Sequence, residues 1–456
     1  MLRICSFFLL IGTLASEPAD AVWSARYVLT MDSRHRVIEN GAVAVRNGRI
    51  VGIGSKREID ARYQPQQRLD RPEAILAPGL INTHTHAAMS LLRGLADDLN
   101  LQDWLNKFIF PAESKNLSRE YVRWGTRLGV LEMLLGGTTT FTDMYYFEDA
   151  VAEVAKEAGM RGVLGETIIG FPVADAKTPA DALRFTEGYL RRFHDDPLVI
   201  PAVAPHAIFT NSDETLKAAR ALANQYGAPL LIHVSETKKE NDDERAKRHM
   251  TPVKALDSLG IFNGRTVAAH CVWVNDADLG ILKARGVGVA HNPSSNAKLA
   301  SGVAPVPKMR AMGIAVGLGT DGPAGSNNDL NLFEEMDLAV KLQNVSTLNP
   351  QALSAEAALE MATIGGARVL GLDKEIGSLD LGKRADLITV RTDRPNGVPL
   401  YNPISQMVYA LKAEDVRDVM INGKVVVRDG QALTLDEHQI LVKAAEYGAQ
   451  VSRSLK

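Results

Sequence analysis

The chain has 456 residues, of which 46% are hydrophobic and 23% charged, which is the composition of an ordinary globular protein with one large or two smaller domains. Its formal net charge at pH 7 is -3, so no basic field supports binding to nucleic acid. No apolar run reaches the length needed to cross a membrane.

The first 21 residues differ from the rest and have the pattern of a secretory signal peptide. A short positive region precedes an apolar run from Ile4 to Ala15, and Ala19 and Ala21 form a small-x-small cleavage pattern. The pattern predicts cleavage after Ala21, a periplasmic or secreted protein, and no membrane attachment once the segment is removed. If the segment is only an apolar extension or a mis-assigned start, the protein would be cytoplasmic. Cleavage would leave Cys271 as the one cysteine, which excludes an intramolecular disulfide.

Both flanks of the central region carry short alternating strands separated by turn signals, at residues 22–74 and 376–430. The dipeptide Asn47-Gly48 is typical of a hairpin turn. Neither flank is long enough to bury a sheet core by itself. We therefore expect the two flanks to pair into one small composite β-sandwich domain, with a helical tail at residues 431–456.

From residue 75 onward, apolar runs of the kind that are buried in a parallel sheet alternate with helical stretches. We expect eight strands, at residues 79–86, 138–144, 162–169, 199–207, 229–236, 265–273, 287–292 and 314–321. Eight strand–helix units over about 250 residues are typical of a (β/α)8 barrel, an α/β fold, which we assign to residues 75–375. The charge-rich run at residues 238–248 predicts a solvent-exposed helix.

The first of these strands ends in two histidines one residue apart, His84 and His86. Residues i and i+2 of a strand point to the same face, so both imidazoles look into one space at the carboxyl end of the strand. Two neutral imidazoles that converge in this way suit a divalent metal ion. A lone His-x-His is a weak signal, and its value depends on what the other strands contribute.

Polar residues at the ends of later strands strengthen this signal, because the active sites of such barrels form where the strands end. Each of them alone could be a core histidine or a turn-forming aspartate. Five later strands nevertheless deliver such residues to the same rim: His206, His233, Glu236, His270, His291 and Asp321.

Three imidazoles and a carboxylate suit a zinc ion with an open position for water, and iron or manganese could use similar ligands. A bound metal makes a nucleophile from water available at neutral pH. Glu236 and His270 would then transfer or orient protons near that water.

These features resemble the amidohydrolase superfamily, over almost the whole chain after the apolar segment. The matching stretches include the run from Pro78 to His86 and the later His233, His270 and Asp321. Within the superfamily the chain is most similar to the 5′-methylthioadenosine/S-adenosylhomocysteine deaminases and their chlorohydrolase relatives. The resemblance implies one metal ion per chain, with four ligands: His84, His86, His233 and Asp321.

The resemblance also implies catalytic and substrate-binding roles. Glu236 would protonate the ring nitrogen beside the attacked carbon, while His270 orients or helps deprotonate the water and Asp321 shuttles its proton. His206 would contact the purine, and Glu113 would accept hydrogen bonds from the ribose diol. Without the resemblance, Glu113 reads as a surface or helix-cap carboxylate.

Two absences refine the expectation. Dinuclear relatives commonly place a bridging carboxylated lysine on the fourth strand, and residues 199–210 contain no lysine, which favours one metal ion. Some relatives use arginines after the third strand to hold the amino-acid tail of S-adenosylhomocysteine. Here residues 167–173 are apolar, with no arginine before Arg184, so methylthioadenosine or adenosine fits better.

The sequence thus predicts metal-dependent hydrolytic deamination of an adenine nucleoside to the inosine analogue and ammonia. The alternatives are a deaminase or chlorohydrolase of another N-heterocycle (guanine-like, pterin, cytosine or triazine), a cyclic-amide hydrolase, which the missing lysine disfavours, and a non-catalytic barrel scaffold. The expected partner is a small-molecule nucleoside and not a nucleic acid. The oligomeric state stays open, with a homo-oligomer among the alternatives.

Overall fold

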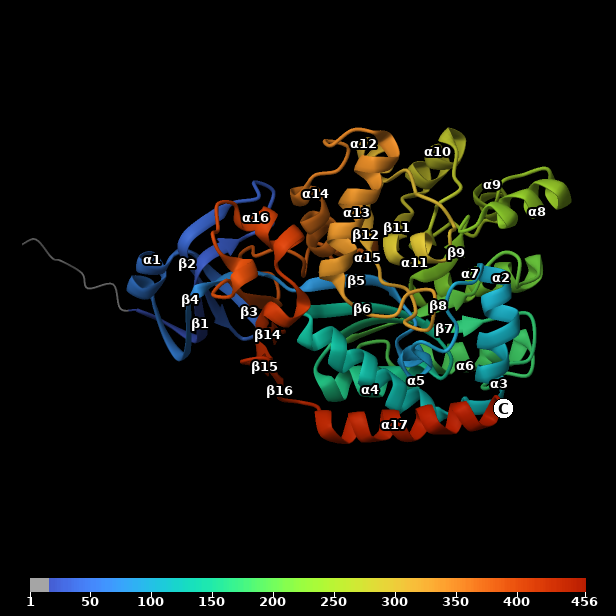
Figure 1. Cartoon of the computed structure of the whole chain (residues 1–456), viewed down its shortest axis with the longest axis horizontal. Coiled ribbons are helices and arrows are strands. Elements are labelled where there is room, and N and C mark those ends of the chain that lie inside the picture. Colours follow the sequence, from blue (N-terminus) through green and yellow to red (C-terminus); the bar gives the residue numbers. More distant parts are fainter. Residues whose placement is uncertain (1–15) are drawn as a thin grey trace, which may run out of the picture.

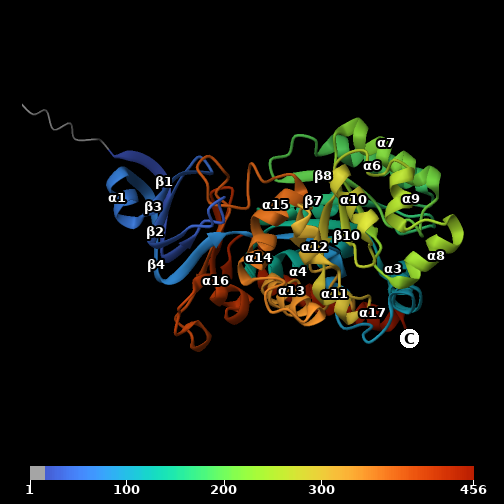
Figure 2. The same ribbon diagram turned by 90° about the horizontal axis from the view of Figure 1, so that it is seen from above.

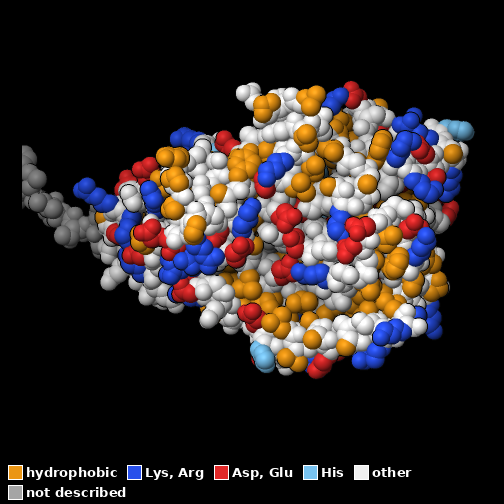
Figure 3. All heavy atoms as spheres, in the orientation of Figure 1, with side chains coloured by type: hydrophobic (Ala, Val, Ile, Leu, Met, Phe, Trp, Pro, Cys, Tyr) orange, Lys and Arg blue, Asp and Glu red, His pale blue; other side chains and the backbone are white. Residues whose placement is uncertain are grey.

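The computed structural model describes residues 16–456, which form a barrel with a β-domain at one end (Figures 1 and 2). Most of the predicted signal peptide lies outside the described residues. Within residues 16–456, no helix has the length and apolar character needed to span a membrane. On the face seen in Figure 3, acidic and basic side chains are interspersed, in keeping with the net charge near zero.

Eight parallel strands form the barrel, each hydrogen-bonded to the next in sequence order. They are β5 (Leu80–Thr85), β6 (Thr138–Tyr145), β7 (Arg161–Ile168), β8 (Val199–Pro205), β9 (Leu230–Val234), β10 (Thr266–His270), β11 (Gly288–His291) and β12 (Val316–Leu318). The ends meet where the hydroxyl of Thr83 donates to the carbonyl of Leu318 at 2.8 Å and the amide of Asp321 donates to the carbonyl of His84 at 3.0 Å. The predicted barrel and all eight predicted strands are confirmed.

Helices cover the outside of the barrel (Figure 2). The longer ones are α4 (Arg119–Leu135), α5 (Glu148–Ala158), α6 (Pro179–Arg192), α7 (Asp213–Tyr226), α8 (Lys238–Arg248), α10 (Asp276–Arg285) and α13 (Leu332–Thr347). Shorter ones are α9 (Pro252–Ser258), α11 (Pro293–Lys298), α12 (Val306–Ala311), α14 (Ala355–Glu360), η3 (Met361–Gly365) and α15 (Gly366–Leu370). Between β5 and β6 an insertion forms η1 (Ala87–Leu92), α2 (Leu101–Trp104), η2 (Leu105–Ile109) and α3 (Phe110–Asn116).

The β-domain is built from both flanks of the barrel, as predicted. The N-terminal flank gives β1 (Glu17–Leu29), β2 (Val37–Arg46), β3 (Arg49–Ser55), α1 (Lys56–Arg62) and β4 (Tyr63–Pro78). The C-terminal flank gives β13 (Leu387–Arg391), η4 (Pro395–Gly397), α16 (Pro403–Ser405), η5 (Gln406–Ala410), η6 (Ala413–Asp415), β14 (Val416–Ile421), β15 (Lys424–Arg428) and β16 (Gln431–Ala432). The flanks join where β13 pairs antiparallel with the end of β4.

The expected sandwich is one continuous sheet of eight strands, in the order β16-β15-β14-β13-β4-β1-β2-β3, that folds over its own core. The amide of Ile50 donates to the carbonyl of Lys383 at 2.9 Å, which brings the far edge of the sheet back to the segment before β13. The enclosed core contains, among others, Trp23, Val43, Leu69, Leu387 and Met420.

The predicted cleavage point after Ala21 lies inside β1. This strand begins at Glu17, and its first residues pair with β4 from Tyr63 onward. Ala19 and Ala21 are buried, and Ala19 packs in a small cluster with Tyr63. The cleavage site that the sequence predicts therefore falls within a strand that is paired in the folded β-domain.

Two further contacts tie the parts together. Arg161 at the start of β7 forms a buried ion pair with Asp386, at 3.1 Å between Nη2 and Oδ2, and so joins the barrel to the β-domain. The last helix, α17 (Glu437–Ser454), runs along α4 and α3 on the outside of the barrel (Figure 1). Its Tyr447 meets Tyr121 edge to face, and Asn116 of α3 donates to the hydroxyl of Ser454 at 2.7 Å.

Candidate active site

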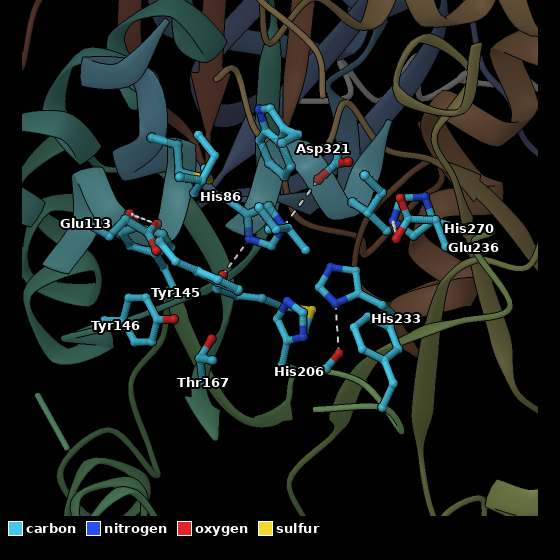
Figure 4. Close-up of a pocket in the computed structure, with 18 residues that line it drawn as sticks. His86, Glu113, Tyr145, Tyr146, Thr167, His206, His233, Glu236, His270 and Asp321 are labelled. Carbon is cyan, nitrogen blue, oxygen red and sulfur yellow. Dashed lines mark hydrogen bonds and ion pairs between the residues drawn. The ribbon is translucent and has the colours of Figure 1, made fainter. Parts of the chain in front are cut away.

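A cavity of about 580 Å³ lies at the carboxyl ends of the barrel strands (Figure 4). The strands and the loops after them contribute His86, Met144, Tyr145, Tyr146, Thr167, His206, Phe209, His233, Glu236, His270 and Asp321. The insertion between β5 and β6 contributes Met89, Leu101, Trp104, Leu105, Ile109, Phe110 and Glu113. The cavity therefore has a polar floor and a largely apolar wall.

The four predicted metal ligands converge at the floor. Nε2 of His84 and Nε2 of His86 lie 3.4 and 3.2 Å from Oδ1 of Asp321. The ring of His233 is centred 4.9 Å from that of His84 and 5.4 Å from that of His86. His84 also converges with His233 and His270, with the nearest ligand atoms of all three within 4.8 Å of one another.

Hydrogen bonds to the backbone orient two of these imidazoles, as the dashed lines in Figure 4 show. Nδ1 of His86 lies 2.6 Å from the carbonyl of Met144, and Nδ1 of His233 lies 2.7 Å from the carbonyl of His206. A carbonyl can only accept, so each Nδ1 carries the proton. Each Nε2 then points away from these carbonyls and, in the neutral ring, is the atom that would bind a metal ion, which is the usual arrangement of histidine ligands.

The donor set fits a divalent cation. Nε2 of His84 is buried and has no hydrogen-bond partner among the described residues. Burial lowers the pKa of His84 to about 4 and that of His233 well below its usual range, so both imidazoles are neutral at pH 7. Burial opposes ionisation of Asp321, but the nearby imidazoles of His84 and His86 hold its pKa well below the usual range. Burial opposes the charged form of His86 too, yet the contact with Asp321 raises the pKa of His86 to about 9. Imidazoles around a carboxylate are a typical zinc environment.

The backbone at Asp321 is in the left-handed region, with φ of 63°, and His270 has φ of 73°. Such conformations are uncommon for residues other than glycine and cluster at functional sites. The carboxylate of Asp321 is held by the hydroxyl of Ser295 at 2.6 Å and by the amide of Gly322 at 2.7 Å. The strained turn and these donors fix the direction of its remaining lone pairs.

Glu236 and His270 lie side by side in the cavity wall, with 3.8 Å between Oε2 and Nε2. Burial raises the pKa of Glu236, and the charge of Asp321 adds to this while His270 opposes it. Nδ1 of His270 lies 2.9 Å from Oδ1 of Asn296 and 3.2 Å from Nδ2 of Asn292, and its Nε2 faces Glu236. A buried carboxyl with a raised pKa is suited to donate a proton.

Glu113 lies at the other end of the cavity and is buried. The hydroxyl of Tyr145 donates to its Oε1 at 2.6 Å. Burial raises the pKa of Glu113 to about 7, although the hydrogen bond from Tyr145 opposes the shift. His206 lies between the two ends, its ring centred 4.7 Å from that of His233. Burial lowers the pKa of His206 to about 3, so it is neutral.

One residue of the predicted constellation is not part of the site. His291 ends β11 as expected, but it is buried and does not line the cavity. Burial lowers its pKa to about 3. Alternate residues of a strand face opposite sides, so a position at a strand end does not by itself decide whether a side chain enters the cavity.

The structure also adds residues that the sequence reasoning missed. Tyr145, the last residue of β6, holds Glu113, while Ser295 and Asn296 at the start of α11 hold Asp321 and His270. Their positions after strands could have drawn attention to them. Their partners, however, come from distant parts of the chain and are visible only in the folded molecule.

The chain belongs to the amidohydrolase family, whose pattern it matches over residues 75–426. A relative from Syntrophobacter fumaroxidans, named 5-methylthioadenosine/S-adenosylhomocysteine deaminase, is 46% identical over 428 residues, or 94% of this chain and 97% of the relative. A crystal structure of an adenosine deaminase from Xanthomonas campestris with bound zinc has a TM-score of 0.94 at 38% identity, over 96% of this chain and 100% of that one. An atrazine chlorohydrolase from Arthrobacter aurescens, complexed with zinc, shares the fold at 24% identity, with a TM-score of 0.86 over 94% of this chain and 100% of that one.

Proposed function

We propose that the protein is a hydrolase that deaminates an adenine nucleoside, giving the inosine analogue and ammonia. The substrate class includes 5′-methylthioadenosine, S-adenosylhomocysteine and adenosine, the compounds in the names of the relatives described above. One observation carries the proposal: a single cavity joins a set of metal-ligating side chains, a buried proton donor at Glu236, and a second buried carboxyl at Glu113.

We assign one zinc ion per chain to the ligands His84, His86, His233 and Asp321. The free Nε2 of His84 and the fixed tautomers of His86 and His233 support this set. The absence of lysine from β8 supports a single ion. When bound, zinc supplies a nucleophile from water at neutral pH and polarises the site.

The residues of the chain handle the protons and hold the substrate. Glu236 keeps a proton beside the ring nitrogen next to the attacked carbon, and delivers it as the ring becomes tetrahedral. His270 and Asp321 take the proton that the attacking water loses, and this proton leaves with ammonia. His206 contacts the purine, and Glu113 accepts hydrogen bonds from the ribose diol.

The test is ammonia release by zinc-loaded enzyme on a panel of nucleosides, free bases and triazines, with metal content measured in parallel. His233→Ala should lose most of its metal, whereas Glu236→Gln should keep it and lose at least about 100-fold in kcat/KM. His194→Ala, at an exposed histidine, is the matched control and should change neither. A stoichiometry near two, or an active Glu236→Gln enzyme, would contradict the mechanism.

The same panel separates the alternative function. Turnover of a guanine-like base, a pterin, cytosine or a triazine, without turnover of any nucleoside, would move the protein to another branch of N-heterocycle deaminases or chlorohydrolases. A stable, metal-loaded protein that acts on none of these compounds would favour the interpretation as a non-catalytic barrel scaffold.

We also propose that the protein is exported and loses its N-terminal segment. Cleavage after Ala21 would remove residues 17–21 of β1, which pair with β4 and bury Ala19. Removal of a segment that ends before Glu17 would leave the sheet whole. N-terminal sequencing of periplasmic protein from a Gram-negative host should therefore give a start no later than Glu17. A start at Val22 would show that the sheet tolerates the loss, and an intact Met1 would remove the export proposal.

A further inference from the structure

A second cavity, of about 750 Å³, lies beyond Glu113 and adjoins the active-site cavity. Three side chains line both cavities: Phe110, Glu113 and Tyr146. None of the proposed metal ligands lines the second one. The second cavity therefore adjoins the active-site cavity at Phe110, Glu113 and Tyr146, on the side away from the proposed metal ligands.

The wall of the second cavity is mostly apolar. Besides the shared residues it consists of Ser114, Leu117, Phe171, Pro172, Val173 and Ala174. The rings of Phe110 and Phe171 meet edge to face, with centroids 5.3 Å apart. No lysine or arginine is among the described residues that line either cavity.

Two lysines on the neighbouring helices are engaged elsewhere. Lys107 forms an ion pair with Asp103 at 2.8 Å, and Lys115 donates to the carbonyl of Ser454 at 3.0 Å. Glu113 is the one carboxylic acid in the wall of the second cavity. A substrate carboxylate placed there would lose part of its hydration, find no cation in the wall, and lie near another acidic group.

The position of this cavity matches one part of a nucleoside. With the base at Glu236 and His206 and the diol at Glu113, the substituent on C5′ is the remaining part that can enter the second cavity. We infer that the cavity selects nucleosides with an uncharged, apolar 5′ substituent, such as a methylthio group, and rejects a zwitterionic amino-acid tail such as that of S-adenosylhomocysteine. The inference rests on the proposed function and narrows its substrate class.

Four adenosines that differ only at C5′ test it: adenosine, 5′-methylthioadenosine, 5′-n-butylthioadenosine and S-adenosylhomocysteine. The butylthio group matches the length of the amino-acid tail and lacks its charges. We expect the kcat/KM values for the two alkylthio compounds to lie within about tenfold of each other. The kcat/KM for S-adenosylhomocysteine should be at least about 100-fold lower than that for the butylthio compound. Equal values for these last two would overturn the inference and leave the proposed function intact.

A substitution provides the converse test. Ala174 is exposed and lines the cavity, so a longer side chain can be accommodated there without repacking the core. Ala174→Arg should raise the ratio of kcat/KM for S-adenosylhomocysteine to kcat/KM for methylthioadenosine about tenfold or more. Ala174→Gln, of similar length and uncharged, is the control. An equal effect of the two substitutions would count against selection by charge, whereas an enzyme that deaminates none of the four compounds would overturn the proposed function itself.

Discussion

Glu113 illustrates how burial gives a single residue its chemistry. Its carboxyl is removed from water, receives one hydrogen bond from Tyr145, and lines both cavities. An ion in such a place is costly unless further donors reach it. A ribose diol supplies two hydroxyl donors, and so Glu113 should bind nucleosides more strongly than compounds without the diol.

Replacing Glu113 by alanine should therefore cost about 2–4 kcal/mol of transition-state binding for a nucleoside, because a pair of charge-assisted hydrogen bonds is lost. Turnover of a 2′,3′-dideoxy analogue should barely change. Steady-state kinetics on the matched pair measures both. An equal loss for the two substrates would mean that Glu113 is structural, and a free heterocycle would become the better substrate.

The pH dependence offers a second measurement on the same residue. Burial raises the pKa of Glu113 to about 7, and the ionised form is the stronger acceptor for the diol. We therefore expect the ratio of kcat/KM for the nucleoside to kcat/KM for its dideoxy analogue to rise as the pH increases from 6 to 8. In Tyr145→Phe the rise should move to higher pH, because the hydrogen bond that favours ionisation is gone. A ratio that does not vary with pH would contradict this role.

At the residue scale, the sequence was sufficient for the side chains that strands deliver directly. The His84–His86 spacing and the strand-end positions of His233, His270 and Asp321 predicted a convergence that the structure shows. His291 shows the limit, because its strand-end position did not decide which way it faces. The role of Glu113 came from family resemblance, since its partner Tyr145 belongs to another strand.

Among the secondary-structure elements, the ends of β6 and β7 carry an unusual group of buried acids. Glu166 is buried beside Asp175: Oε2 of Glu166 accepts from the amide of Glu148 at 2.9 Å and Oδ2 of Asp175 accepts from the amide of Phe147 at 2.6 Å, while Oε1 of Glu166 and Oδ1 of Asp175 meet no donor among the described residues. Two neighbouring buried carboxyl groups can bond each other only if one is protonated. Burial first, and then the neighbouring acids, raise the pKa of Glu166 well above its usual range.

This pair should make the stability of the fold depend on pH. The folded state keeps a proton that the unfolded chain has released, so the stabilisation by this proton is complete below the ordinary glutamate pKa. It is lost as the pH rises through the raised folded pKa. Glu166→Gln, whose amide can donate to Asp175 without a shared proton, should therefore gain in melting temperature relative to the unmodified protein as pH rises from 5 to 9. Glu39→Gln, at an exposed position, is the control. Parallel curves for Glu166→Gln and the unmodified protein would refute the shared proton.

Helix α8 shows why elements are easier to predict than their contacts. The charge-rich run predicted a helix over residues 238–248, and α8 has these bounds. Solvent exposure, however, was only partly right, because Glu240 and Glu244 are buried. Glu240 accepts from the amides of Ser235 and Glu236 at 2.9 and 2.8 Å and thus shapes the loop that carries Glu236. A charge pattern cannot reveal a backbone partner in the preceding loop.

For the molecule as a whole, the Arg161–Asp386 ion pair links the barrel to the β-domain. Both side chains are buried, and Asp386 also accepts from the amide of Asn422 at 2.6 Å. Removing one partner leaves the other charge buried and alone. The two parts of the molecule should therefore lose stability together.

Arg161→Ala should lower the free energy of unfolding by about 3–5 kcal/mol. The matched control is Arg285→Ala, which breaks an exposed pair with Asp257 and should cost at most about 1 kcal/mol. Urea denaturation followed by circular dichroism measures both. Equal losses in the two variants would show that the buried pair contributes no more than a surface one.

The composite β-domain could be predicted because neither flank can bury a core alone, but its strand order could not. The pairing of β13 with β4 and the fold of the sheet over Trp23 depend on contacts between residues more than 300 positions apart. The start of β1 at Glu17 was missed for a similar reason. The residues before Val22 match a cleavage pattern in the sequence, whereas the residues of β4 with which they pair begin at Tyr63, more than 40 positions later in the chain.

The contact between α17 and α3 has a practical consequence for anyone who handles the protein. Ser454 accepts hydrogen bonds from Asn116 at its hydroxyl and from Lys115 at its carbonyl, and these are the last two residues of α3, the short helix that presents Glu113. An affinity tag or fluorophore fused after Lys456 would pull on this last turn and, through α3, on the end of the cavity that should hold the sugar. Its signature would be a raised KM with an undisturbed metal content, and kinetic constants for nucleosides are best measured after such a fusion has been removed.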